Sequence, residues 1–204
     1  MRYYMLNKPM NMICAVSDVR HKVVMECFSD ADRSGLYPVG RLDKDTEGLL
    51  LITDDGDFTY KVLDPKSGVE KTYLFYAKGI LTEDKIKLLE SERIIGGGRE
   101  FLSLGAKVEL LQIIKMRDAK DKLIRENPDK IIHTKRGDIP LSVGMITIKE
   151  GKKHQVKRML LSVGMEVVYL KRIRIGALSL DCNLGVVEYR SLTDKEIALA
   201  LKNS

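Results

Sequence analysis

The chain has 204 residues, of which 44% are hydrophobic and 31% are charged. This length and composition suit a folded protein with a sizeable core and exclude extensive disorder. No uncharged apolar run, including the one at 49–52, approaches the ~18 residues that a membrane-spanning helix needs, so no membrane contact is expected. The N-terminal MRYYMLNKP has a lysine and a proline before any secretory apolar region could form, so no signal peptide is expected.

Cysteine usage and the distribution of charge indicate a compartment and a class of partner. The three cysteines are widely spaced and form no CxxC pair, so neither a disulfide framework nor a structural zinc site is expected, and a reducing cytoplasm is predicted. The net charge of +6 is unevenly spread. Residues 149–174 hold eight Lys/Arg against two Glu, whereas residues 42–70 hold eight acids against three Lys. The first segment is suited to face an anion, and the second concentrates carboxylates.

In the first third of the chain, the apolar pattern predicts two strands separated by a long irregular region. Residues 2–6 are expected to form a strand, and the polar residues 17–35 a loop with a short helix. A proline and a glycine favour an extended or turning segment over 36–43. The apolar run 49–53, closed by Asp-Asp-Gly-Asp, is typical of a buried strand before a tight turn, and a short helix is expected at 58–63.

From residue 70 onward, strands and helices alternate regularly. Strands are predicted at 71–77, 107–112, 145–149, 167–175 and 186–190. Helices are predicted at 82–91, at 154–163 and after Thr193, where Glu196 completes a capping box. The charge-rich residues 115–139 are interpreted as an insertion. The order βαβ–insertion–βαβ predicts an α+β fold, with a mixed, mainly antiparallel sheet, helices packed on it, and a split βαβ (ferredoxin-like) lobe.

Residues 40–48, GRLDKDTEG, place three acids and two glycines in nine positions. One interpretation is a solvated turn, and a second is a calcium loop running from Asp43 to Asp54. The calcium loop needs a helix on each side, which the apolar strand at 49–53 opposes. A third interpretation is that one carboxylate performs covalent or acid/base chemistry. Such a carboxylate must stay ionised in a semi-enclosed pocket, and a cation from the basic segment 149–174 would serve this purpose.

Four separated motifs resemble RNA pseudouridine synthases of the ribosomal small-subunit type, the RsuA-like branch. The run LYPVGRLDKDTEGLLLITDDGD resembles that family's catalytic motif. The other three, in the same order as in the family, are MLNKPMNMI (5–13), GVEKTY (68–73) and EGKKHQVKRMLLSVGMEVVYLKRIRIGALSL (150–180). The resemblance implies a single pseudouridine synthase catalytic domain over 1–204. Its expected parts are lobes near 1–66 and 67–180, a C-terminal strand and helix at 186–202, and the insertion 115–139.

The resemblance implies an enzyme that isomerises a specific uridine in structured RNA, with ribosomal RNA the expected substrate, and that needs no metal or other cofactor. The N1–C1′ bond breaks, the uracil rotates, and C5 rejoins the sugar. The resemblance implies that Asp43 is the reacting carboxylate, that Tyr73 is the active-site tyrosine, and that Lys157 is the cation that pairs with Asp43. Three routes remain open: attack on C1′, attack on C6, or abstraction of the 2′ proton to give a glycal.

The resemblance also indicates how RNA is held. Base extraction is expected, and Arg41 matches the arginine that enters the RNA stack where the target uridine flips out. The predicted RNA-binding residues are Arg41, Lys152, Lys153, Gln155, Arg158, Lys171 and Arg172. Most relatives carry an S4-type RNA-binding module before this domain, whereas this chain starts at its MLNKP strand; a monomer is expected. The alternative from another class is a non-catalytic RNA-binding or ribosome-assembly protein on the same scaffold.

Overall fold

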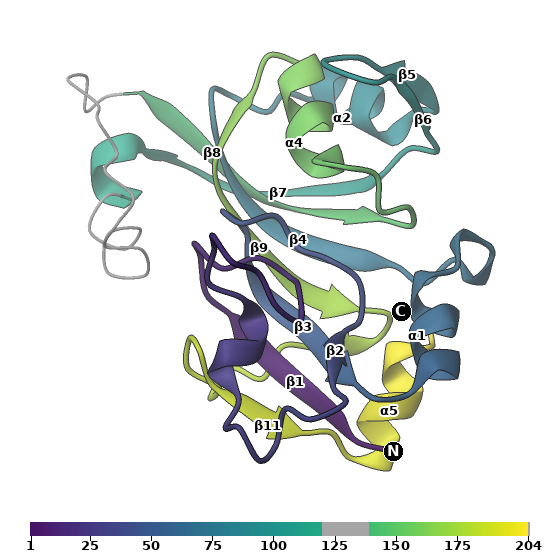
Figure 1. Cartoon of the computed structure of the whole chain (residues 1–204). Coiled ribbons are helices and arrows are strands. Elements are labelled where there is room, and N and C mark those ends of the chain that lie inside the picture. The colour runs from purple at the N-terminus through teal and green to yellow at the C-terminus, as the bar shows by residue number, and fades with distance from the viewer. Residues whose placement is uncertain (120–138, 204) are drawn as a thin grey trace. The chain divides into compact units, whose positions relative to one another are not determined.

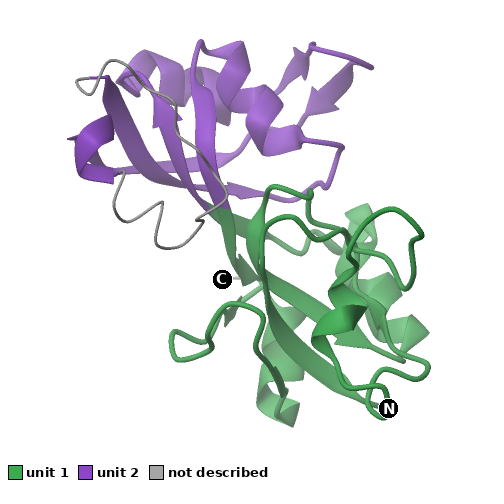
Figure 2. Ribbon diagram, turned by 60° about the vertical axis from the view of Figure 1, so that its left-hand side comes forward, with its two compact units in different colours: residues 1–73, 171–204 green, residues 74–170 purple. Residues whose placement is uncertain are grey.

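The computed structural model describes residues 1–119 and 139–203, which form two compact units (Figures 1 and 2). Unit 1 comprises residues 1–73 and 171–204, and unit 2 comprises residues 74–170. The chain passes from one unit to the other within strand β4 (Lys71–Lys78) and again within strand β9 (Glu166–Ile175). The single catalytic domain predicted for 1–204, with its two lobes, stays a prediction.

Unit 1 contains a sheet in the order β11-β1-β3-β9. Strand β1 (Tyr3–Lys8) runs antiparallel to both β11 (Tyr189–Ser191) and β3 (Glu47–Thr53). Strand β3 runs parallel to β9. The short strands β2 (Tyr37–Pro38) and β10 (Leu178–Ser179) pair antiparallel with β3 and β9. One parallel pair among antiparallel ones gives the mixed, mainly antiparallel sheet that the sequence predicts.

Helices α1 (Gly56–Leu63) and α5 (Asp194–Ala200) complete the core of unit 1, with the 3-10 helices η1 (Val24–Cys27) and η2 (Pro65–Ser67) in its loops. Every residue of β3 is buried, as the apolar run predicts. The packed cluster includes Met5, Leu49, Leu51, Phe58, Val62, Ile175 and Ala200. The α5 capping box of Thr193 and Glu196 is confirmed.

Unit 2 contains the strands β4, β8 (Pro140–Ile148) and β7 (Lys107–Lys115) in that order. Helices α2 (Glu83–Glu90) and α4 (Gln155–Ser162) lie on one side of β7 and β8, together with an antiparallel hairpin of β5 (Arg93–Ile95) and β6 (Phe101–Ser103) (Figure 1). Strands and helices packed in this way confirm the α+β class. No helix among the described residues combines the length and the apolar composition needed to cross a membrane.

Two differences from the sequence expectations have physical causes. The β5–β6 hairpin is not among the strands predicted from the sequence, because each of its strands has three residues, too few for alternation to be visible. Strand β8 begins at Pro140 rather than at residue 145. Its Gly144 is needed because a Cβ there would meet the carbonyl oxygen of Glu109 at 2.5 Å and the ring of Phe75 at 2.7 Å. Most of the predicted insertion 115–139 lies outside the described residues.

Candidate functional site

The acidic turn, residues 40–48, lies at the N-terminal end of β3 in unit 1. Thr46 N–H donates to the carbonyl oxygen of Asp43 at 3.1 Å, which closes the turn over Lys44 and Asp45. Leu42 and Thr46 are buried on either side of Asp43, while Asp43 itself is half-buried. The predicted catalytic carboxylate therefore sits on a turn that the core anchors at both ends.

A fully buried lysine at the end of β1 supports this turn. Lys8 Nζ donates to the carbonyl oxygens of Pro9 at 2.8 Å, Thr46 at 2.9 Å and Asp43 at 3.3 Å. Burial lowers the pKa of Lys8, although Cys14 and the nearby acids act in the opposite direction. One ammonium thus ties the chain after β1 to the acidic turn. This role of Lys8 was not predicted from the sequence, where its one signal is the lysine–proline pair that follows the first predicted strand.

The backbone after β1 makes further contacts with the acidic turn. Asn11 N–H donates to the carbonyl oxygen of Lys44 at 2.8 Å, and Leu42 N–H donates to Cys14 Sγ at 3.2 Å. Asn11 has a φ of 65°, in the left-handed region that glycine prefers and asparagine tolerates. Residues 8–14 and 42–46 therefore form one connected support for Asp43.

Gly48 allows β9 to pack closely against the start of β3. Its φ is +101°, and a Cβ at this position would collide with the carbonyl oxygen of Arg172, its partner in the parallel pairing. Arg172 is 5% exposed, and its Nε donates to the carbonyl oxygen of Leu49 at 2.8 Å. In the structure, this predicted RNA-binding residue ties β9 to β3.

Tyr73 lies in unit 1 as well, on β4, and is 9% exposed. Strand β9 lies between β3 and β4. On its β4 side, Arg174 donates to Thr72 Oγ1 through Nη2 at 3.2 Å and Nε at 3.3 Å, and on its β3 side Arg172 pairs with Gly48. Tyr73 is therefore about two strand spacings, roughly 10 Å, from the start of β3 that Asp43 precedes.

Lys157 lies in unit 2, on the first turn of α4, and is half-buried. The helix starts after His154, whose φ is 53°. The pairing of Lys157 with Asp43 stays a prediction.

The other predicted RNA-binding residues differ in accessibility. Arg41, Lys152 and Lys153 are exposed, and Lys171 is half-buried. Gln155 is 3% exposed; its Oε1 accepts from Lys152 N–H at 3.0 Å. Arg158 donates to backbone carbonyl oxygens of residues 95–99. Gln155 and Arg158 therefore shape loops of unit 2.

The calcium interpretation gains no support from the structure. The acidic turn lies between the strands β2 and β3, not between two helices as in a calcium-binding loop of this type. In residues 1–119 and 139–203, no three His, Cys, Asp or Glu side chains are grouped so that they could hold a metal ion.

Comparisons of sequence and structure identify the family. The sequence profile of RNA pseudouridylate synthase matches residues 2–162. The uncharacterized RNA pseudouridine synthase YtzG of Bacillus subtilis is 39% identical over 198 residues, covering 97% of this chain and 72% of that protein. Ribosomal small subunit pseudouridine synthase A of Escherichia coli K12 is 36% identical over 197 residues, covering 97% of this chain and 73% of that protein.

Solved structures agree with the sequence relatives. A crystal structure of pseudouridylate synthase matches with a TM-score of 0.77 and 32% identity, covering 98% of this chain and 73% of that chain. Human RNA pseudouridylate synthase domain containing 1 has a TM-score of 0.62 at 14% identity over 98% of this chain and 91% of that chain, a likeness of fold alone. The chain thus belongs to the RNA pseudouridylate synthase family, whose members convert uridine in RNA to pseudouridine.

Proposed function

We propose that this protein isomerises one uridine of small-subunit ribosomal RNA to pseudouridine, with Asp43 as the reacting carboxylate. The observation that carries the proposal is the anchored acidic turn: Cys14 holds the backbone before Asp43 through Leu42 N–H, and Lys8 and Asn11 hold the backbone at and after Asp43. The ribosomal substrate is inferred from the relatives named as ribosomal small subunit synthases, which are 34–36% identical over 97% of this chain. We further propose that the protein acts as a monomer in the cytoplasm.

The reaction requires a carboxylate at the sugar–base junction, and this junction is inaccessible while the uridine is stacked in RNA. We propose that the target uridine flips out, which costs a few kcal/mol, and that Arg41 enters the stack it leaves. The N1–C1′ bond then breaks, the uracil rotates, and a C5–C1′ bond forms. The proton on C5 is lost and N1 gains one, so the atoms balance without an oxidant or reductant. A turn already fixed in the free protein reduces the entropy lost in bringing the carboxylate to C1′, C6 or the 2′ proton.

Tyr73 and Lys157 complete the proposed catalytic set. Tyr73 is proposed to stack on the freed uracil through the face of its aromatic ring. Lys157 is proposed to pair with Asp43. Lysine keeps the charge of arginine but lacks its planar fork, so Lys157→Arg is expected to retain activity and Lys157→Met to lose it.

The test is tritium release from small-subunit ribosomal RNA labelled with 5-³H-uridine. Asp43→Asn keeps the size of the side chain and removes the carboxylate, so the rate is expected to fall at least about 100-fold. The matched control is Asp45→Asn, an exposed acid on the same turn, which is expected to stay within a few-fold of wild type.

RNA affinity measured by filter binding separates catalysis from binding. Asp43→Asn is expected to bind labelled RNA as tightly as wild type. Tritium release that survives in Asp43→Asn would remove this residue from the mechanism. Tight RNA binding by the wild type, without tritium release from any ribosomal RNA, would instead support the non-catalytic alternative.

A further inference from the structure

A pocket lined by basic residues lies wholly within unit 2. A pocket of about 820 Å³ is lined on one side by residues 97–102 and on the other by Lys152, Lys153, His154 and Arg158. Arg99 contributes a further cation, and Glu100 is the one acid in the lining. We propose that this pocket binds a backbone phosphate of the RNA substrate. The inference rests on the proposed function, because it names the part of the RNA that the pocket recognises.

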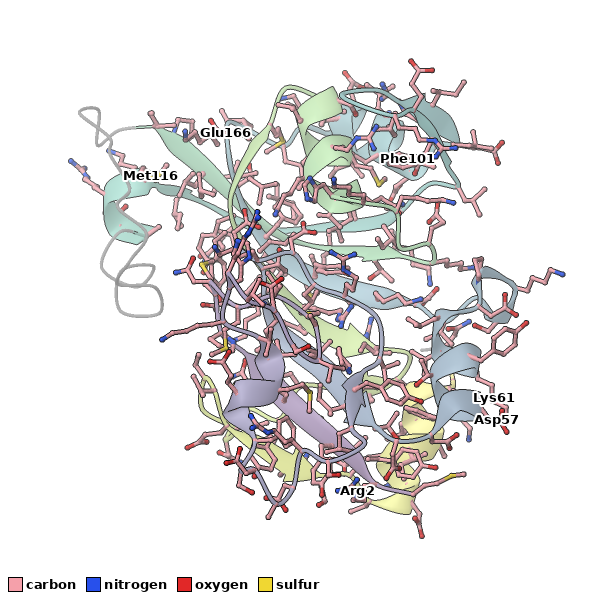
Figure 3. All side chains as sticks on the ribbon, viewed as in Figure 1. Arg2, Asp57, Lys61, Phe101, Met116 and Glu166 are labelled. Carbon is pink, nitrogen blue, oxygen red and sulfur yellow. The ribbon has the colours of Figure 1, made fainter. Side chains whose placement is uncertain are left out.

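The glycine-rich side of the pocket is held in place by Arg158. Its guanidinium donates to the carbonyl oxygens of Ile95 at 3.1 Å, Gly96 at 2.9 and 3.0 Å, and Arg99 at 2.8 Å. The same group lies 4.5 Å from the ring centre of Phe101, on the hairpin next to α4 (Figure 3). Carbonyl oxygens that would repel an anion are thus occupied by a cation, which ties the loop to α4.

The same loop has open space where a phosphate would lie. Gly97 and Gly98 have φ values of +80° and +123°, and a Cβ at either position would meet nothing within 4 Å. The glycines therefore permit a backbone conformation that other residues rarely adopt, and no protein atom fills the space beside them. Close approach of a ligand to backbone is a common use of glycine.

The lysine side of the pocket is anchored by the same helix. Gln155, buried at the start of α4, accepts from Lys152 N–H, which fixes the loop bearing the exposed Lys152 and Lys153. Gln155 and Arg158 are one turn apart, so α4 sets the position of both sides of the pocket. The exposed side chains of Arg99, Lys152 and Lys153 line this pocket and match the chemistry of a phosphate, which Lys and Arg bind through charge-assisted hydrogen bonds.

The test is the double variant Arg99→Gln/Lys153→Gln, assayed by filter binding of labelled small-subunit ribosomal RNA over a series of salt concentrations. Each lost phosphate contact lowers the slope of log affinity against log salt by nearly one, so we expect the slope to fall by about one to two and the affinity by about tenfold. In the tritium-release assay, the KM for RNA is expected to rise about tenfold, because the pocket is proposed to act in RNA binding. The matched control is Lys85→Gln/Lys87→Gln on α2, which removes the same charge from unit 2 and is expected to keep the wild-type slope.

The outcomes separate the two proposals. If wild type releases tritium but the double variant has the salt slope and KM of the α2 control, the phosphate pocket is wrong and the proposed function stands. If wild type releases no tritium while the double variant still loses RNA affinity relative to the control, the proposed function fails and the pocket is supported. The single variant Lys153→Gln, expected to show about half of the slope change, supplies the same test should the double variant fold poorly.

Discussion

Replacing Gly48 with alanine tests whether the close approach of β9 positions the acidic turn. Gly48 pairs with Arg172 of β9, lies five residues after Asp43 and has a φ of +101°. Gly79, beyond the end of β4, has nearly the same φ of +102°, yet a Cβ there would meet nothing within 4 Å. The two alanine variants therefore share the backbone strain and differ in the collision with the Arg172 carbonyl oxygen.

The expected magnitudes follow from these two contributions. Alanine at such a φ costs on the order of 1–3 kcal/mol, and this cost applies to both variants. The collision at Gly48 forces β3 and β9 apart, and overpacking of this kind costs about 1–3 kcal/mol more. Gly48→Ala is therefore expected to lower the free energy of unfolding by about 2–6 kcal/mol, and Gly79→Ala by about 1–3 kcal/mol.

Urea unfolding followed by far-ultraviolet circular dichroism measures the difference, since the chain has no tryptophan to report by fluorescence. Tritium release, measured at a temperature where both variants remain folded, is expected to fall much more in Gly48→Ala than in Gly79→Ala. Equal unfolding free energies and equal activities in the two variants would show that the Arg172 carbonyl group moves aside freely. The close β3–β9 contact would then not position Asp43.

Three other changes have defined outcomes. Lys8→Met leaves three carbonyl oxygens without their donor and is expected to lower the free energy of unfolding, measured in urea, by about 2–3 kcal/mol. Lys44 is an exposed lysine on the same turn, and Lys44→Met is expected to change the free energy of unfolding by less than about 0.5 kcal/mol. Hydrogen bonds from Arg190 lower the pKa of Glu196 from 4.5 to about 2. The ionised Glu196 therefore stabilises the fold above pH 4.5, and this stabilisation is lost as the pH falls towards 2. Glu196→Gln is expected to make the free energy of unfolding less dependent on pH in this range. Burial raises the pKa of the Cys14 thiol, so iodoacetamide at pH 8 is expected to modify the exposed Cys182 well before Cys14, as mass spectrometry of the digested protein would show.

The parts of the fold that depend on local signals could be predicted from the sequence. The run 49–53 identified a buried strand, and Thr82 and Thr193 identified the starts of two helices, because a side-chain cap acts within its own turn. The N-terminal part of β8 could not be predicted in this way. Its proline and glycine argue against a strand, and only the positions of Glu109 and Phe75, both far away in the sequence, explain why glycine is required at 144.

The residues of the candidate site also differ in how far the sequence predicts their roles. A resemblance of motifs indicated Asp43 and Tyr73, and the structure places both in unit 1. Charge alone, however, does not distinguish a residue that binds RNA from one that holds a loop. Arg158 and Arg172 share the basic segment with Lys152 and Lys153, yet both arginines donate to backbone carbonyl oxygens of the protein itself. Only three-dimensional packing shows which cations are left at the surface.

Lys8 illustrates why a costly group can be useful at an active site. Burial lowers its pKa despite four groups that favour the charged form, so the ammonium is held there against a desolvation penalty. An apolar side chain would avoid this penalty but could not join the carbonyl oxygens of Asp43 and Thr46 to the chain after β1. The lysine therefore contributes more to the position of the turn than to the net stability of the fold. For this reason, Lys8→Met is expected to lower tritium release well beyond the fraction of protein that it unfolds, and a loss of activity that only matched the unfolded fraction would contradict a positioning role.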